Sequence, residues 1–351
     1  MRNEHRAGVA LGVLGVTSLV AGLFARRRAR DDLRGKTVVI TGGGRGLGLS
    51  LARAFAAEGC TLFLAGRDVT TLDEARARLS EQGIAATVVP CDVTDSKQAQ
   101  RLIRAAEDAT GAVDVLVNNA GIIDCGPMEV MVREDFERAM QTHFWGAYNT
   151  ISAALPKMRA RGDGRIVNVS SIGGVLAVPH LLPYCASKFA LRGLSEGLRV
   201  ELGKEGIAVT TVCPGLMRTG SPRNASFKGE HRAEYAWFVL GASLPFTSMN
   251  ADRAARQIVS ATAHRRAHVI LGWQAKLVAL AHGVAPGVIE AMMAGMARLL
   301  PSAGGIGALS ATGEQSQSPI TRSFVTALDD RAAKANNELP SSYLVDRPSH
   351  A

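Results

Sequence analysis

A glycine-rich turn constrains the fold of this chain more than any other feature of the sequence. The residues before it, 36–41 (KTVVIT), are rich in β-branched side chains, as expected of a buried parallel strand. The turn reads GGGRGLG, and an apolar-periodic helix is predicted after it, over residues 49–58. Because glycines let the backbone approach a pyrophosphate at a helix N-terminus, this strand, turn and helix predict a phosphate cradle.

Predicted strands and helices alternate through most of the chain. This alternation requires right-handed crossovers and predicts an α/β fold with a doubly wound parallel sheet of about seven strands, a Rossmann fold. Pro156 is expected to bend one long helix near its end. The further strands are predicted at residues 61–65, 86–90, 113–117, 165–170, 207–213 and 268–271, and the further helices at 70–82, 96–110, 133–161, 183–204 and 252–264.

The composition excludes several classes of protein. The chain has 351 residues, of which 47% are hydrophobic and 20% charged, as in a globular protein with a substantial core. The net charge is +9, and residues 1–36 hold eight basic but only three acidic side chains. No basic stripe alternates with aromatic residues, so no nucleic-acid partner is expected. The five cysteines are scattered without a C-x-x-C pair, which argues against a disulfide framework or a metal site and fits a reducing compartment.

The N-terminus contains a candidate membrane segment. Residues 7–25 form an uncharged run of nineteen residues, long enough to cross a bilayer as a helix. The arginines at positions 26, 27, 28 and 30 favour an uncleaved anchor over a signal peptide, although a helix on the membrane surface or a frayed extension is an alternative. The positive-inside rule then predicts a membrane-anchored protein whose folded domain faces the cytoplasm, with residues 1–34 as anchor and basic flank.

The end of the second predicted strand indicates which dinucleotide binds. In a dinucleotide fold this position faces the adenosine ribose, where an acidic residue would accept the 2′-hydroxyl of NAD. Here the strand ends at Gly66 and Arg67. Arg67 and Arg45, the latter in the glycine turn, would instead pair with a 2′-phosphate, which favours NADP(H) over NAD(H). Asp68 follows directly, and solvated surface positions for both arginines are the alternative.

Polar residues follow the next two predicted strands as well. Asp92 would accept the adenine amino group, or would cap the helix predicted to begin at Ser96. Residues 118–121 (NNAG) follow the central strand, and their amides suggest a structural brace beside the cofactor.

A serine, a tyrosine and a lysine are spaced for proton transfer. Ser171 follows the fifth predicted strand, and Tyr184 and Lys188 are one turn apart on the next predicted helix. An ammonium beside a phenol favours the phenolate, so Lys188 is expected to lower the Tyr184 pKa from about 10 toward neutral. Such a tyrosine exchanges protons at physiological pH, and Ser171 would hold the substrate oxygen. A Tyr-x-x-x-Lys pair also arises by chance, so its weight depends on the other motifs.

In this order the motifs resemble those of the short-chain dehydrogenase/reductase family in its single-domain form. The resemblance covers residues 35–271 and implies a Rossmann-fold oxidoreductase domain over residues 35–272, which interconverts alcohols and carbonyls with NAD(P). It implies that Tyr184 is the general acid/base, that Lys188 lowers its pKa and binds ribose, and that Ser171 binds the substrate oxygen. The cofactor-binding residues it implies are Thr41, Gly42, Gly44, Arg45, Gly46, Leu47, Gly48, Arg67, Asp92, Val93, Asn119, Ala120, Gly121, Tyr184, Lys188, Pro214, Gly215 and, for the carboxamide, Thr219.

One residue departs from the family pattern. The family's active-site asparagine, whose backbone carbonyl supports a water relay to the lysine, aligns with His143. A histidine retains the carbonyl and would either titrate within the proton path or pack as a neutral helix residue. We include His143 among the candidate catalytic residues.

The chain after the P-G motif suggests a lipophilic substrate. Residues 216–249 should form a lid and are rich in aromatic residues, although these side chains would also suit a core or a dimer contact. With a membrane anchor, such a lid resembles the steroid-, retinoid- and lipid-acting members of the family. Residues 273–300 are apolar and predicted to be helical, and residues 301–351 lack periodicity and are predicted to be mostly disordered. We also predict a homo-oligomer, either a dimer or a tetramer.

Overall fold

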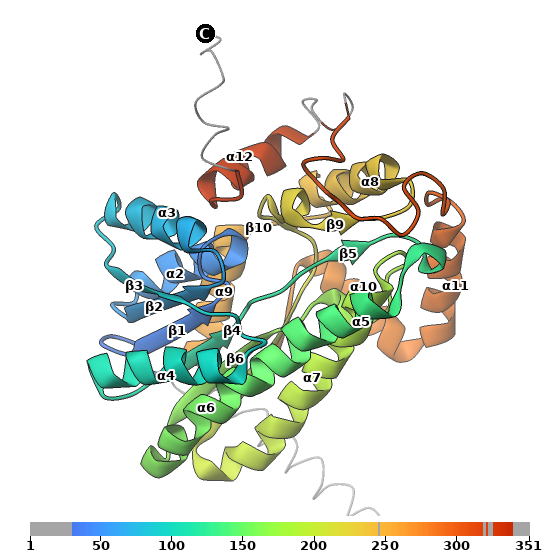
Figure 1. Ribbon diagram of the computed structural model, residues 1–351. Helices are drawn as coiled ribbons and strands as arrows, with labels where there is room; N and C mark the ends of the chain where they lie inside the picture. The colour runs from blue at the N-terminus through green and yellow to red at the C-terminus, as the bar shows by residue number, and fades with distance from the viewer. Residues whose placement is uncertain (1–29, 245, 319–320, 322–325, 340–351) are drawn as a thin grey trace, which may run out of the picture.

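A seven-stranded parallel sheet forms the centre of the molecule (Figure 1). The computed structural model describes residues 30–339 except 245, 319–320 and 322–325. The strand order is β11-β7-β6-β4-β1-β2-β3, and the order reverses between β1 and β4, where ligands of doubly wound folds bind. The predicted Rossmann fold is therefore confirmed. The strands are β1 (Thr37–Thr41), β2 (Thr61–Gly66), β3 (Ala86–Pro90), β4 (Val115–Asn118), β6 (Gly164–Val169), β7 (Ile207–Pro214) and β11 (His268–Leu271).

Helices cover both faces of this sheet and bury two separate apolar cores. On one face, apolar side chains of α2, α3 and α9 pack against the strands. On the other face, α4, α6 and α7 do the same. Continuous runs of buried residues in the central strands follow from this two-sided cover. The helices are α2 (Gly46–Ala56), α3 (Val69–Ser80), α4 (Ser96–Thr110), α6 (Gly146–Arg161), α7 (Leu182–Leu202) and α9 (Ala251–Ala263).

The long helix predicted over residues 133–161 is interrupted, although not where the sequence suggested. It consists of α5 (Arg133–Met140), a π-helical turn (Gln141–Trp145) and α6, which runs through Pro156 without ending there. A π-helical turn inserts an extra residue into the helix and is frequent at functional sites. Here the turn contains His143, which is only 1% exposed.

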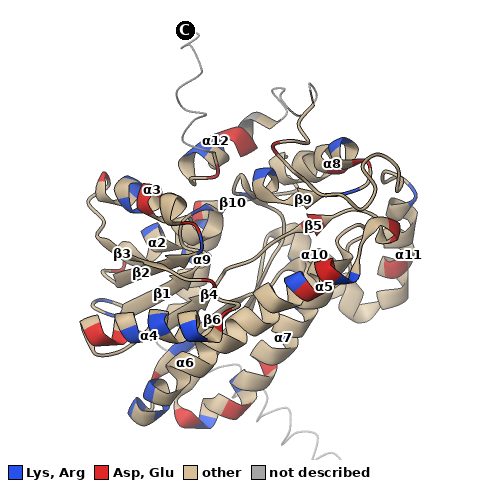
Figure 2. Ribbon diagram, viewed as in Figure 1, with Lys and Arg blue, Asp and Glu red and all other residues tan. Residues whose placement is uncertain are grey.

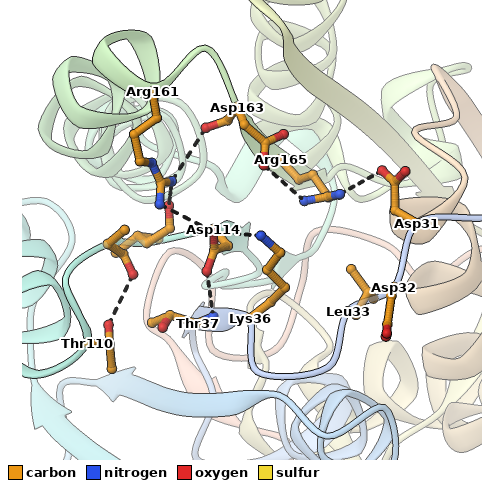
Figure 3. A network of polar contacts seen from close by, with 12 residues as sticks. Asp31, Asp32, Leu33, Lys36, Thr37, Thr110, Asp114, Arg161, Asp163 and Arg165 are labelled. Atoms are coloured by element: carbon orange, nitrogen blue, oxygen red, sulfur yellow. Dashed lines mark hydrogen bonds and ion pairs between the residues drawn. The ribbon is translucent and has the colours of Figure 1, made fainter.

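An ion network joins the strands at the edge of the sheet opposite to the site motifs (Figure 3). Asp114, just before β4, accepts a hydrogen bond from the backbone N–H of Thr37 at 2.9 Å and one from Arg161 at 3.3 Å. Arg165 of β6 is 3% exposed and donates to Asp31 at 2.6 Å. This network connects the beginnings of β1, β4 and β6, so we interpret it as a structural brace.

The segment predicted to form a lid folds over the carboxyl ends of the strands. Its main helix is α8 (His231–Ser243), and its short strand β9 (Ser226–Phe227) pairs with β5 (Asp124–Cys125) and β12 (Ala311–Thr312). The apolar stretch that follows the central sheet contains α10 (Trp273–Val284) and α11 (Pro286–Ala297), which meet at Ala285.

The C-terminal part of the chain differs from the sequence-based expectation. Residues 301–351 were expected to be mostly disordered, whereas their described part contains β12 and helix α12 (Ala327–Ala335). Helix α12 lies across the carboxyl edge of the sheet between α3 and α8 (Figure 1). Its contacts are mainly polar ones to distant segments, which leave no hydrophobic periodicity in the sequence.

The predicted membrane segment, residues 7–25, lies outside the described residues. Within residues 30–339, as far as they are described, no helix combines the length and the apolar character needed to span a bilayer.

Candidate active site

Ser171, Tyr184 and Lys188 come together at the carboxyl end of β6. Ser171 follows the strand and begins a short 3₁₀ turn, where its Oγ accepts the Gly173 N–H at 3.0 Å. Tyr184 and Lys188 lie on α7, with the Lys188 Nζ 5.6 Å from the centre of the tyrosine ring. Lys188 Nζ also donates to the carbonyl of Val169, the last residue of β6, at 2.9 Å. The predicted proton-transfer group is therefore assembled by one strand and one helix.

Burial controls the protonation of this group. It raises the pKa of Tyr184 to about 12, although a hydrogen bond with Ser171 acts in the opposite direction. Burial also lowers the pKa of Lys188 to about 7. The expectation that Lys188 brings the tyrosine pKa toward neutral is not met here, because desolvation penalises the phenolate and also leaves Lys188 only partly charged at neutral pH. The phenol of Tyr184 is consequently protonated at neutral pH.

His143 is a neutral residue held by two hydrogen bonds. Its Nε2 accepts the backbone N–H of Ile122 at 3.1 Å, which places the ring proton on Nδ1. Nδ1 lies 2.7 Å from the Ser187 hydroxyl, which donates in turn to the carbonyl of Tyr184 at 2.8 Å. Burial, aided by the charge of Lys188, holds the His143 pKa well below its usual range. The geometry therefore favours the packed, neutral role over the titrating one.

A pH profile tests this role of His143. We expect His143→Asn to keep kcat/KM within about threefold and to leave its pH dependence between pH 5 and 8 unchanged, because a neutral ring does not titrate there. Steady-state kinetics of both proteins across this range provide the measurement. A kinetic limb near pH 6 in the parent that disappears in the variant would show instead that His143 takes part in proton transfer.

The glycine turn, residues 42–48, is braced by the N-N-A-G segment as the sequence suggested. The hydroxyl of Thr41 accepts the N–H groups of Asn119 and Ala120 at 3.0 and 3.1 Å. The Asn119 amide donates to the carbonyls of Thr41 and Gly42, both at 3.1 Å. A Cβ on Gly48 would lie 1.9 Å from the Gly42 carbonyl oxygen, so only glycine fits this close turn.

Two arginines lie where the adenosine ribose of a dinucleotide is expected to bind. Arg67 is exposed directly after β2, and Arg45 is exposed in the glycine turn. The Asp68 carboxylate accepts the Thr71 N–H at 2.7 Å and caps α3, and that bond lowers its pKa. Asp68 is therefore engaged with a helix terminus and is less available to a ribose hydroxyl.

The remaining predicted residues follow the same edge of the sheet. Asp92 accepts the N–H and the hydroxyl of Thr94, whereas the cap of α4 is Asp95, so the alternative role of Asp92 as a helix cap is wrong and its predicted contact with adenine stays a prediction. Pro214 ends β7, and Thr219 is buried and donates to Ser221 at 2.7 Å. Val93 and Gly121 also lie in these loops, whereas Leu47 is in the first turn of α2. A Cβ on Gly121 would be 3.0 Å from the His143 ring and 3.7 Å from Lys188 Nζ.

Three residues beside the glycine turn escaped the sequence analysis. Asn336, Asn337 and Glu338 follow α12 and are each at most 5% exposed. No motif or periodicity marks them, because only the tertiary fold brings the end of the chain to this turn.

Comparisons with known proteins agree with this geometry. A family model described as short chain dehydrogenase matches residues 36–228. A fatty acyl-CoA reductase of Acinetobacter baylyi is 38% identical over 192 residues, which cover 54% of this chain and 65% of that protein. A solved short-chain dehydrogenase of Streptomyces avermitilis has a TM-score of 0.64 and 31% identity, and the match covers 75% of this chain and 98% of that one. For gluconate 5-dehydrogenase of Burkholderia cenocepacia in complex with NADP and tartrate the TM-score is 0.61 and the identity 28%, with 71% and 99% of the two chains covered.

The sheet, the glycine turn at its switch point and the adjacent serine, tyrosine and lysine define a Rossmann-fold oxidoreductase. The chain belongs to the short-chain dehydrogenase/reductase family, and it is an NAD(P)-dependent enzyme that acts on CH–OH groups.

Proposed function

We propose that the protein interconverts a lipophilic alcohol and its carbonyl compound, with NADP(H) as the favoured cofactor and Tyr184 as the general acid/base. The observation that carries this proposal is the apolar cluster around Tyr184. This cluster joins the lid to the loop that precedes the tyrosine. Its buried members are Cys125, Leu181, Cys185, Ala225, Phe227, Tyr235, Phe238 and Val239, with Ile123, Val178, Tyr184 and Trp237 partly buried against them.

Aromatic contacts within the lid give this cluster a defined shape. The Phe227 ring lies edge-on to Tyr235 and to Phe238, with ring centres 5.4 and 6.0 Å apart. The Trp237 indole N–H donates to the buried Glu234 carboxylate at 2.6 Å, which fixes its orientation. Apolar walls beside a proton donor bind lipophilic ligands, because a few polar groups orient the reacting atom while the surrounding surface supplies affinity. The relative described as a fatty acyl-CoA reductase supports this substrate class.

The residues at the glycine turn suit an anionic dinucleotide. The first turn of helix α2 contains no acidic residue, and Arg45 directly precedes this helix. Our preference for NADP(H) depends on Arg45 and Arg67, and the solved relative in complex with NADP supports it. When bound, the cofactor exchanges a hydride with the substrate carbon.

The roles of the side chains in the reaction follow from the protonation of Tyr184 and from the positions of the residues around it. With a pKa near 12, the Tyr184 phenol is protonated at neutral pH and would donate its proton to the substrate oxygen during reduction. The Ser171 hydroxyl would donate a hydrogen bond to the same oxygen. Lys188 would assist the tyrosine by its charge when its amine is protonated, and His143 would position the α7 backbone through Ser187.

A substrate panel tests the proposed function. With NADPH we expect long-chain ketones and aldehydes to be reduced with kcat/KM at least about tenfold above that of polar sugar-like ketones, because apolar burial favours them. Phe238→Ala should raise the KM for the lipophilic substrates several-fold with little change in kcat. Steady-state oxidation of NADPH provides both readouts.

Phe246 provides the matched control in the same lid. Its side chain is 80% exposed, so Phe246→Ala should leave both constants unchanged. Preference for polar ketones, or equal effects of the two variants, would contradict the lipophilic substrate. Cofactor binding without turnover of any carbonyl compound would favour a non-catalytic regulatory or scaffold protein at the membrane.

Two expectations about assembly and location remain proposals. The uncharged run at residues 7–25 motivates a membrane anchor with the enzyme domain in the cytoplasm. Extraction of the protein from membranes by alkaline carbonate would contradict an inserted anchor. We also propose a dimer or tetramer, which a monomer mass in analytical ultracentrifugation would contradict.

A further inference from the structure

The chain that follows α12 lies directly on the glycine turn. The carbonyl of Asn336 accepts the Gly46 N–H at 2.8 Å, and its side-chain oxygen accepts the Ser50 hydroxyl at 3.1 Å. The Asn337 amide donates to the carbonyl of Gly44 at 3.0 Å. The Gly46 N–H is at the N-terminus of α2, where a dinucleotide-binding fold directs backbone N–H groups toward the pyrophosphate.

The carboxylate of Glu338 lies at the centre of this contact. Its side chain is only 3% exposed, and Oε2 is 3.7 Å from the Arg45 Nε. Asn224 of the lid donates to the same oxygen at 2.5 Å. A Cβ on Gly46 would be 2.5 Å from Oε1 and 3.9 Å from the Thr219 Cβ. An acidic group therefore fills the space between the glycine turn and the loop after β7.

Helix α12 holds this segment against the lid. The Asp329 carboxylate accepts the Gly220 N–H at 3.2 Å, and Asp330 forms an ion pair with Arg223. Ala333 is fully buried in contact with Gly220, where an added Cβ would meet it at 2.4 Å. In Figure 2 the acidic stretch of α12 is visible as a red segment of the helix. The segment thus bridges the two sides of the proposed cofactor site.

We propose that residues 327–338, here named the C-terminal strap, compete with the dinucleotide for the glycine turn, so that cofactor binding requires release of the strap. This inference rests on the proposed binding of NADP(H) at that turn. The Glu338 carboxyl group and a cofactor phosphate would both lie beside Gly46 and Arg45, and the two cannot occupy one space. The strap is thereby an autoinhibitory element, and its anchors at Gly220 and Arg223 link its release to the lid.

The protonation of Glu338 indicates when the strap is held most firmly. Burial raises the pKa of this carboxyl to about 7 from an ordinary value of 4.5; of the charged groups that face it, Arg45 lowers the pKa and Asp329 raises it. Because the Glu338 pKa is higher when the strap is docked than when it is free, protonation of Glu338 favours docking of the strap. This contribution is complete below about pH 4.5 and is lost as the pH rises through 7. The strap should therefore compete more strongly at pH 6 than at pH 8.

The test measures cofactor binding and strap release in the full-length protein. Glu338→Ala removes the carboxylate, and Ala333→Leu displaces the strap by crowding Gly220 without a change in charge. We expect both variants to lower the Kd for NADPH about tenfold in a fluorescence titration. In the parent protein, NADPH should increase hydrogen–deuterium exchange of peptides from residues 327–338. Glu290→Gln on the exposed side of α11 is the control and should change neither readout.

Every outcome of this test either supports or contradicts competition between the strap and the cofactor. A higher Kd in the strap variants, or greater protection of the strap with NADPH, would show that the strap belongs to the cofactor site and would overturn the proposal. Unchanged Kd and exchange would also overturn it, as would a failure of parent and variants to bind NADPH or NADH. Binding with strap release but without turnover of any carbonyl would support this inference and contradict the proposed function, so the two failures are distinguishable.

Discussion

Tyr184→Phe is expected to lower kcat for carbonyl reduction by about 10²- to 10⁴-fold, the range typical of a lost general acid. Tyr184 belongs to the apolar cluster beneath the lid, and its phenol remains protonated at neutral pH because burial raises its pKa to about 12. Phenylalanine preserves the ring and its edge-on contact with His143, so the variant should fold and bind NADPH like the parent. Single-turnover oxidation of NADPH, with the cofactor Kd measured in parallel, separates chemistry from binding.

The chain provides a matched tyrosine for comparison. Tyr148 on α6 is 46% exposed and packs edge-on to Trp145, away from the serine and lysine. Tyr148→Phe should retain the parent rate, which controls for the loss of any tyrosine hydroxyl. Full turnover by Tyr184→Phe would remove the tyrosine from the mechanism, and the Ser171 hydroxyl would then be the next candidate proton donor.

The sheet could be predicted because its signals are local. Most of the sheet strands are short runs rich in β-branched residues that end near glycine or polar residues, and each helix between them has an apolar face. The hydrophobic periodicity and the turn residues are therefore enough to place them. The break in the helix over residues 133–161 is different. Pro156 is a visible helix breaker but sits inside α6, whereas the π-helical turn at His143 depends on the packing of that ring against Ile122 and Ser187. No sequence signal marks such a turn.

In the candidate site, too, some features could be predicted from the sequence and others could not. Ser171, Tyr184 and Lys188 were predictable because parallel strands deliver their carboxyl ends to one edge, so position along the chain implies position in space. Their protonation was not predictable, since it depends on burial, which a sequence does not measure. Residues 336–338 were unpredictable for a third reason. They act through backbone carbonyls, amides and one carboxylate, and their partners at the glycine turn are distant in sequence.

Arg67→Ala is expected to raise the Kd for NADPH on the order of tenfold, through loss of a charge-assisted contact with the 2′-phosphate, and to leave the Kd for NADH within about threefold. Arg67 is exposed after β2, whereas the neighbouring Asp68 is engaged in capping α3. A substitution at this position should therefore alter cofactor choice without altering the fold. Titrations of both cofactors against the same protein preparation provide the measurement.

The two arginines are not equivalent in this test. Arg45 would face a bound phosphate and also pairs with Glu338 of the strap, so Arg45→Ala would weaken the binding of both the cofactor and the strap. Its net effect on the NADPH Kd should thus be smaller than that of Arg67→Ala. Arg76→Ala on the exposed face of α3, where Arg76 pairs only with Asp73 among the described contacts, controls for general loss of positive charge. An NADPH Kd that none of the three substitutions changes, or tighter binding of NADH than of NADPH by the parent protein, would overturn the preference for NADP(H), because neither arginine would then contact a 2′-phosphate.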